Sequence, residues 1–164
     1  TLNASRIIDA MMRVTGLGYE EFDEAALSVP DAGGLRLIPY FEGERTPNLP
    51  EATASLEGMT LSNCDRAHVA RATIEGLLTL MRGALDAVRA QGVAVERVLL
   101  VGGGARSSAV RTLASEALGA TAEVPHPGEY VALGAAMQAA TVEVSPPAFP
   151  RVEDGSARAG ETNV

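Results

Sequence analysis

The chain has 164 residues, long enough for one domain with a core of its own. Apolar residues make up 46% of it and aromatic residues only 4%, with no tryptophan, which suits helices packed on a sheet and argues against a carbohydrate-binding sandwich lined with aromatic rings. Its formal net charge of −8 disfavours nucleic acid and anionic lipid as partners, and no apolar run approaches the roughly 20 residues of a membrane span, so we expect a cytoplasmic protein that binds neither.

The first third of the chain predicts two short helices, one strand and a loop. Apolar residues recur at helical spacing between residues 4 and 15, and Gly16 stands where a helix C-terminal cap is expected. A second helical segment runs from Glu20 to Val29, and Leu35–Ile38 has the composition of a strand. The next stretch, Pro39–Pro50, contains three prolines and a glycine and therefore predicts an ordered loop.

The longest predicted helix begins after Asp65, whose carboxylate suits an N-cap, and Gly92 is expected to end it. Cys64 and Val69 flank the cap at the positions of a hydrophobic staple, so we expect Cys64 to be a small core residue. The apolar stripe expected along this helix comprises Val69, Thr73, Leu77, Leu80, Ala84 and Val88.

The second half of the chain continues the alternation of strands and helices. Val95–Val101 is a run enriched in valine and leucine, typical of a strand covered on both faces. Helices are expected over residues 106–118 and Tyr130–Thr141, with a short strand over Thr121–Val124. This order indicates an α/β layer fold. Residues 143–164 are expected to form a disordered tail.

Three consecutive glycines, Gly102–Gly104, follow the predicted Val95–Val101 strand directly. Without a β-carbon, this backbone can approach a ligand closely, and free amides at the start of the 106–118 helix can hold an anion. One interpretation is a nucleotide or phosphate site at the C-terminal edge of the sheet. The other is a tight strand-to-helix turn without a ligand, and the glycines alone favour neither.

Two nucleotide-binding motifs can be compared with this turn. A phosphate loop of the G-x-x-x-x-G-K-[ST] form is excluded, because no lysine follows the glycines. The dinucleotide fingerprint fits in part. Gly102 and Gly104 match its first two glycines, Ser107 replaces the third, and Glu123 lies near the place of the ribose-binding acid. A dinucleotide-binding module of the Rossmann type is therefore an alternative function.

Four stretches of the chain carry a family resemblance. They are Ala54–Met59 followed by His68–Glu75, then Leu37–Pro47, Val101–Ser107 and Tyr130–Ala136. Ala54–Met59 together with His68–Glu75 resembles the second signature of the FGGY carbohydrate kinases, and Leu37–Pro47 resembles a loop typical of xylulokinases. Val101–Ser107 resembles the family's adenosine motif, and Tyr130–Ala136 resembles its last conserved helix. The likeness covers that family's C-terminal, nucleotide-binding domain over residues 1–142, and within the family it is greatest to the xylulokinases.

The resemblance implies a ribonuclease H-like, actin-like ATPase fold of the α/β class, incomplete at its N-terminal hairpin, with ATP bound between two domains. In the adenosine motif it implies nucleotide contacts for Gly103, Gly104 and Ala105. It also points to Ser108, where the family often has an asparagine that meets adenine, so this position departs from the family's pattern. The start of the first helix lines the nucleotide site in relatives, which adds Asn3.

The resemblance also implies an activity. The chain would be the C-terminal, ATP-binding portion of a kinase that phosphorylates D-xylulose to D-xylulose 5-phosphate, with glycerol, ribulose and gluconate kinases of the same family as alternatives. The family's catalytic aspartate and magnesium ligands lie outside the stretch that this chain resembles. We therefore expect ATP or ADP with Mg²⁺ as ligands, no catalytic residue or metal ligand in this chain, and no activity of the chain alone.

The sequence begins at Thr1 without an initiator methionine, so we expect it to be a piece of a longer protein whose N-terminal kinase domain is its partner, beside ATP and the sugar. Absence of the N-terminal hairpin would expose a sheet edge and apolar surface. We therefore expect self-association, a homodimer included.

Several polar side chains have two interpretations. Glu42, Glu44 and Arg45 in the proline-rich loop predict a structural salt bridge or, as the alternative, contact with a ligand or with the other domain. His68 lies in the first turn of the longest predicted helix, and we expect it to cap or pack there and not to catalyse.

Overall fold

The computed structural model describes residues 6–45, 47–126 and 130–141. They fall into two compact units, the first ending at Pro127 and the second beginning at Gly128. The tail predicted over residues 143–164 lies outside the described residues. No helix of the described part combines the length and the apolar character that crossing a bilayer requires.

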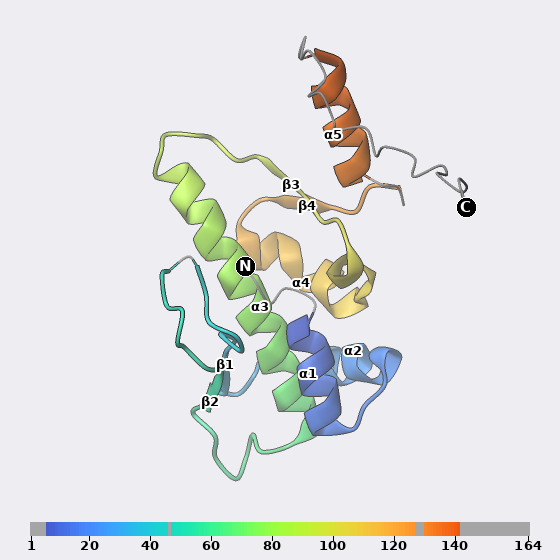
Figure 1. Ribbon diagram of the computed structural model, residues 1–164. Helices are drawn as coiled ribbons and strands as arrows, with labels where there is room; N and C mark the ends of the chain where they lie inside the picture. The colour runs from blue at the N-terminus through green and yellow to red at the C-terminus, as the bar shows by residue number, and fades with distance from the viewer. Residues whose placement is uncertain (1–5, 46, 127–129, 142–164) are drawn as a thin grey trace, which may run out of the picture. The chain divides into compact units, whose positions relative to one another are not determined.

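The first unit mixes helices and strands, and they alternate from β2 to β4, which confirms the predicted α/β class (Figure 1). Its elements are α1 (Arg6–Thr15), α2 (Tyr19–Leu27), β1 (Arg36–Ile38), β2 (Ser55–Glu57), α3 (Arg66–Arg89), β3 (Arg97–Leu99), the 3₁₀ turn η1 (Gly103–Arg106), α4 (Ser108–Leu118) and β4 (Thr121–Glu123). The second unit contains α5 (Tyr130–Thr141).

The described strands form two small sheets. β1 pairs with β2 in antiparallel fashion, with Leu37 opposite Leu56, and β3 pairs with β4 in parallel, with Val98 opposite Ala122. The parallel pair is linked through α4, as expected for a strand, helix, strand unit. The sequence did not predict β2, because Ser55–Glu57 contains no β-branched or aromatic residue to indicate a strand.

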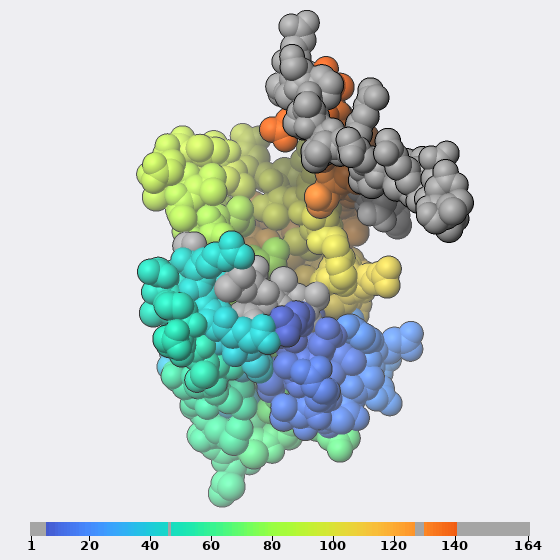
Figure 2. Space-filling model, in the orientation of Figure 1, coloured from blue at the N-terminus to red at the C-terminus, as the bar shows by residue number. Residues whose placement is uncertain are grey.

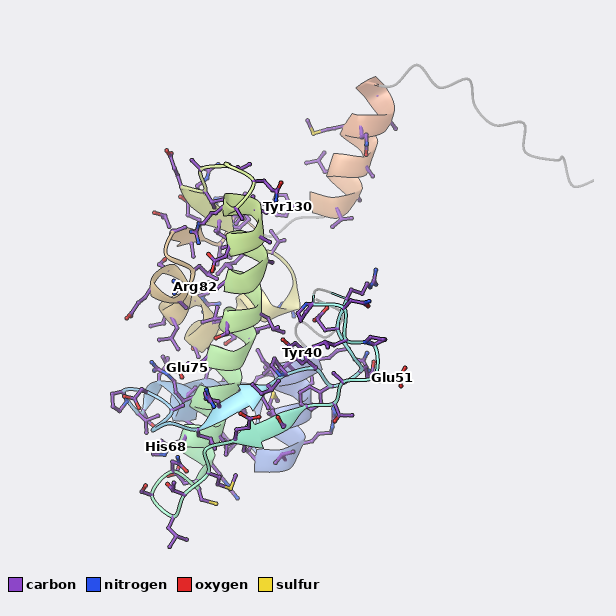
Figure 3. The ribbon with its side chains drawn as sticks, turned by 90° about the vertical axis from the view of Figure 1, so that its left-hand side faces the viewer. Tyr40, Glu51, His68, Glu75, Arg82 and Tyr130 are labelled. Atoms are coloured by element: carbon purple, nitrogen blue, oxygen red, sulfur yellow. The ribbon has the colours of Figure 1, made fainter. Side chains whose placement is uncertain are left out.

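Helix α3 is the central element of the first unit, and α1, α2, α4 and β1 all pack against it (Figure 1). Thr73 and Leu77 of the predicted stripe are buried. The prediction is wrong for the end of the stripe, because Ala84 is exposed and Val88 is 44% exposed. Figure 3 shows His68, Glu75 and Arg82 spaced along this helix. The core lies on its first half, where α1, α2 and β1 supply partners.

A buried asparagine that sequence reasoning missed fixes the chain ahead of α3. Asn63 is 1% exposed, and its amide nitrogen donates to the carbonyl oxygens of Gly33 at 2.9 Å and Gly58 at 3.0 Å. Its Oδ1 accepts from the Thr60 amide at 2.7 Å. Because these bonds satisfy buried backbone groups, Asn63 ties the turn before β1 to the turn after β2.

The predicted N-cap of α3 is confirmed. Asp65 Oδ1 accepts from the His68 amide at 3.0 Å, and His68 Nδ1 lies 2.8 Å from Asp65 Oδ2. His68 therefore has the capping role that the sequence predicts. The expected core position of Cys64 is wrong, because this side chain is exposed and forms no buried staple with Val69.

We predict that Asp65→Ala lowers the free energy of unfolding by about 1 kcal/mol at neutral pH. Hydrogen bonds from the backbone and side chain of His68 hold the pKa of Asp65 below its usual value. The cap's contribution is therefore present above the unfolded-state pKa and is lost as pH falls through the lower folded-state pKa. Denaturant titrations at neutral pH and at about pH 2 should show the gap between wild type and variant shrinking in acid. A gap independent of pH would contradict this.

The proline-rich loop lies beside α1 on one face of the first unit (Figure 2). Arg6 of α1 makes a two-pronged ion pair with Glu42, with both nitrogen to oxygen distances at 2.8 Å. Glu44 is buried, and its Oε1 accepts from the Arg45 amide at 2.8 Å. The structural salt bridge predicted for this loop is thus observed at Glu42, with a partner on α1.

Strand β3 is not covered on both faces, contrary to the sequence prediction. Leu99 is 49% and Val101 53% exposed, although Leu100 is buried. Among the described residues only β4 pairs with β3, so one edge of β3 carries backbone groups without a neighbouring strand.

We predict that the isolated 164-residue chain self-associates through this edge of β3. Sedimentation velocity over a concentration series should show a mass that rises above the 16.9 kDa of the monomer. Leu99→Lys should reduce the association, because an exposed lysine on an edge strand opposes pairing. A wild-type chain that stays monomeric at the highest concentration would contradict the prediction.

Candidate functional site

The glycine turn, residues 102–106, begins where the chain leaves β3. The Leu100 amide still donates to the Glu123 carbonyl of β4 at 2.8 Å. Gly102 then adopts φ 90° and ψ −170°, a conformation that is open essentially to glycine alone. Within η1, the Ala105 amide donates to Gly102 O at 3.2 Å, which turns the backbone toward α4.

A pocket of about 360 Å³ opens against this turn. Apolar side chains of α3, β3 and α4 form its walls, and the backbone of the turn forms the rest. None of the described residues that line it is charged. The lining residues are Leu77, Met81, Leu99, Leu100, Val101, Gly102, Gly103, Gly104, Ala105 and Val110. Such a lining fits a flat, largely apolar group better than a phosphate.

Three of the five residues predicted to contact a nucleotide lie together in this pocket. Gly103 is exposed, Gly104 is half-buried and Ala105 is buried. Ser108, the first residue of α4, does not line the pocket, and its hydroxyl donates to Asp23 of α2 instead. Asn3 lies outside the described residues.

Gly104 has no internal reason to be glycine. A β-carbon built there meets no atom of the described residues within 4 Å, and its φ lies outside the left-handed region. At Gly76 of α3, by contrast, a β-carbon would lie 2.7 Å from the Leu37 carbonyl oxygen. The backbone at Gly104 therefore faces open space, as a surface approached closely by a ligand would.

The start of α4 does not offer the free amides on which the phosphate interpretation of the sequence depends. The helix begins at Ser108, and the Ser107 hydroxyl already accepts from the Val110 amide at 3.0 Å. The Ser108 amide donates to Asp23 Oδ2 at 2.6 Å. Since a side-chain cap and a carboxylate take these two amides, the prediction that they are free to bind phosphate is wrong.

Asp23 of α2 is the polar residue of this region that sequence reasoning missed. It also accepts from the hydroxyl groups of Ser107 at 2.6 Å and Ser108 at 3.1 Å. The Ser108 side chain is thus already bonded to a carboxylate. No local signal could have revealed the contact, because 84 residues separate Asp23 from Ser107.

A smaller pocket of about 170 Å³ lies between α1 and the proline-rich loop. Its lining includes Arg6 and Glu42, which pair with each other, together with Asp9 and Arg13. Asp9 accepts a hydrogen bond from the Tyr19 hydroxyl. Because Arg6 and Glu42 pair with each other and Asp9 is bonded to Tyr19, these side chains already have partners within the protein. This pocket is therefore a weaker candidate for a ligand site than the glycine turn.

Magnesium does not fit the residues of the glycine-turn pocket. Oxygen ligands, above all carboxylates, bind this ion, and the described residues that line the pocket include no carboxylate. Across the described part of the chain, no three histidine, cysteine, aspartate or glutamate side chains gather as a metal site would require.

Comparison with known proteins gives a consistent result. The model of the C-terminal domain of the FGGY family of carbohydrate kinases matches residues 4–142. The xylulose kinase of Haemophilus influenzae is 34% identical over 130 residues, which are 79% of this chain and 26% of that protein. The glycerol kinase of Solidesulfovibrio magneticus is 32% identical over 118 residues, 71% of this chain and 24% of that protein. The chain thus spans about a quarter of the length of these relatives.

Solved structures agree with the sequence relatives. The crystal structure of xylulose kinase from Bifidobacterium adolescentis has a TM-score of 0.77 and 50% identity, and the match covers 85% of this chain and 28% of that one. Plasmodium falciparum glycerol kinase with ADP has a TM-score of 0.71 at 22% identity, covering 81% of this chain and 27% of that one, which shows a shared fold alone. These neighbours confirm the actin-like ATPase fold, of which this chain carries part.

Proposed function

Because the chain belongs to the FGGY family of carbohydrate kinases, as its C-terminal domain, we propose that its glycine turn binds the adenosine half of ATP in a sugar kinase. The observation that carries the proposal is the apolar pocket of about 360 Å³ beside Gly104, whose backbone is open to a ligand. A purine is flat and apolar on its faces, so it suits walls such as Leu77 and Val110.

The substrate that we propose is D-xylulose, with ADP and D-xylulose 5-phosphate as products. Support comes from the xylulose kinases among the relatives, at 34% and 50% identity. Because a glycerol kinase is 32% identical, the alternative substrate is another sugar or polyol on which kinases of this family act. The side chains that read the sugar lie outside the pocket described above.

We assign this chain the adenosine contacts and none of the bond-making steps. Phosphoryl transfer needs a base for the sugar hydroxyl, donors for the β and γ phosphates and carboxylates for magnesium. The apolar pocket supplies none of these groups. We therefore propose that an N-terminal kinase domain supplies them and that the chain alone is inactive. The compartment that we propose is the cytoplasm, where a single exposed cysteine such as Cys64 stays reduced.

The dinucleotide module is less well supported. Glu123, its candidate ribose-binding acid, lies 3.7 Å from Arg97 and does not line the pocket. The third glycine of the fingerprint is Ser107, which caps α4.

Calorimetric titration of the intact protein with ADP and with NAD⁺ tests the proposal. We expect ADP to bind and NAD⁺ to bind more weakly or not at all. An assay of ADP release with D-xylulose and glycerol then identifies the phosphate acceptor. An intact protein that binds no ADP and consumes no ATP with any ketose or polyol would overturn the proposed function.

A further inference from the structure

A buried carboxylate ties α2 to the end of the glycine turn. Asp23 is 8% exposed and accepts three hydrogen bonds, from Ser107 Oγ, Ser108 N and Ser108 Oγ. Within the described residues no cation pairs with it. Its charge is instead held by two hydroxyl groups and by the amide at the positive end of the α4 dipole.

The residue that Asp23 holds directly follows the turn. Ser107 is the C-cap of η1 and the N-cap of α4, and its amide donates to Gly104 O at 3.2 Å. A shift of Ser107 would therefore shift the backbone at Gly104 and Ala105, which lines the pocket.

A second tether acts on the same backbone. Arg111 Nη1 donates to the carbonyl oxygens of Ala105 at 3.0 Å and Arg106 at 2.7 Å. Arg111 belongs to α4 itself, so it fixes the turn to its own helix. Within the part of the chain that the structure describes, the hydrogen bonds of Asp23 to Ser107 and Ser108 join the segment that follows the turn to α2.

We propose that Asp23 is a positioning residue for the nucleotide: it holds the glycine turn in the shape that receives adenosine, without touching the ligand. The inference rests on the proposed function. It also accounts for the Ser108 amide at the start of α4, which donates to the Asp23 carboxylate at this positive end of the helix.

A purely structural role predicts a different kinetic result from a positioning role. If Asp23 only stabilised the fold, its loss would lower the melting temperature and the yield of active protein, leaving the KM values of the surviving enzyme unchanged. If Asp23 positions the turn, the KM for ATP rises, whereas kcat and the KM for the sugar stay near their wild-type values.

The experiment uses the intact kinase with Asp23→Ala, the near-isosteric Asp23→Asn and the control Glu24→Gln. Glu24 is the exposed neighbour on α2 and makes no hydrogen bond or ion pair within the described part of the chain, so Glu24→Gln removes the same charge without removing the tether. We expect the KM for ATP to rise about tenfold in Asp23→Ala and about threefold in Asp23→Asn, whose amide retains one acceptor oxygen. Glu24→Gln should match the wild type.

Two results would overturn the inference. One is an unchanged KM for ATP in Asp23→Asn, which keeps its volume and remains informative where Asp23→Ala fails to fold. The other is a KM for the sugar that rises as much as the KM for ATP, because it would show a general loss of structure. A wild-type enzyme that binds no ADP would overturn the proposed function and this inference together.

Discussion

Gly76→Ala is expected to destabilise the fold by about 2 kcal/mol, despite the better helix propensity of alanine. An added β-carbon would lie 2.7 Å from the Leu37 carbonyl oxygen and 3.3 Å from the Leu37 β-carbon. Leu37 cannot move away easily, because β1 is paired with β2 at this residue. The close approach of α3 to β1 therefore depends on a bare backbone at Gly76.

The same helix offers a matched control. Gly83 is exposed, and a β-carbon built there meets no described atom within 4 Å. Gly83→Ala should therefore stabilise the protein by up to about 1 kcal/mol through helix propensity alone. Thermal and denaturant unfolding of the intact protein measure both changes. Equal effects of the two substitutions, in either direction, would contradict the close approach of α3 and β1.

Sequence reasoning succeeded where the physical cause is local. The N-cap at Asp65 needs only the residues that follow it, and the cap geometry is confirmed. The glycine turn was located because three glycines directly follow a run of valine and leucine, although the glycines alone favoured neither a ligand site nor a plain tight turn. The α/β class followed from the alternation of patterns, each of which is set by its own segment.

It failed where the cause joins distant segments. Asp23 lies in α2 with no motif around it, and its partners are 84 and 85 residues away. Asn63 bonds to Gly33 across 30 residues. The stripe on α3 was extended to Val88 because periodicity shows which face is apolar but not how far the neighbouring elements reach along it.

The chemistry of the pocket could also not be predicted without the fold. From the sequence, glycines before a helix suggest phosphate, because free helix amides attract anions. In the structure the Ser108 amide donates to Asp23, and Leu77, Leu99 and Val110 line the pocket beside the turn. These contacts support the proposal that this turn meets the base and sugar of a nucleotide and not its phosphates.

Substitutions at Gly104 are expected to weaken ADP binding without lowering the stability of the fold. Gly104→Ala should weaken ADP binding about tenfold and Gly104→Val about 100-fold, because overpacking a close contact costs roughly 1–3 kcal/mol, with one added carbon near the lower end of this range and three near the upper end. In the absence of nucleotide the melting temperature should stay near that of the wild type, since a β-carbon at Gly104 meets no described atom within 4 Å. Calorimetric titration with ADP and thermal unfolding without it measure the two effects separately.

The comparison with Gly76 makes this result specific. Gly76→Ala should lower the melting temperature and leave the ADP affinity of the folded protein unchanged, because the contact that it disturbs is with Leu37 and lies outside the pocket lining. Gly104→Val should do the reverse. A Gly104→Val protein with wild-type affinity for ADP would mean that the nucleotide does not approach this backbone. The open space at Gly104 would then be ordinary solvent, and the adenosine site would have to be placed elsewhere.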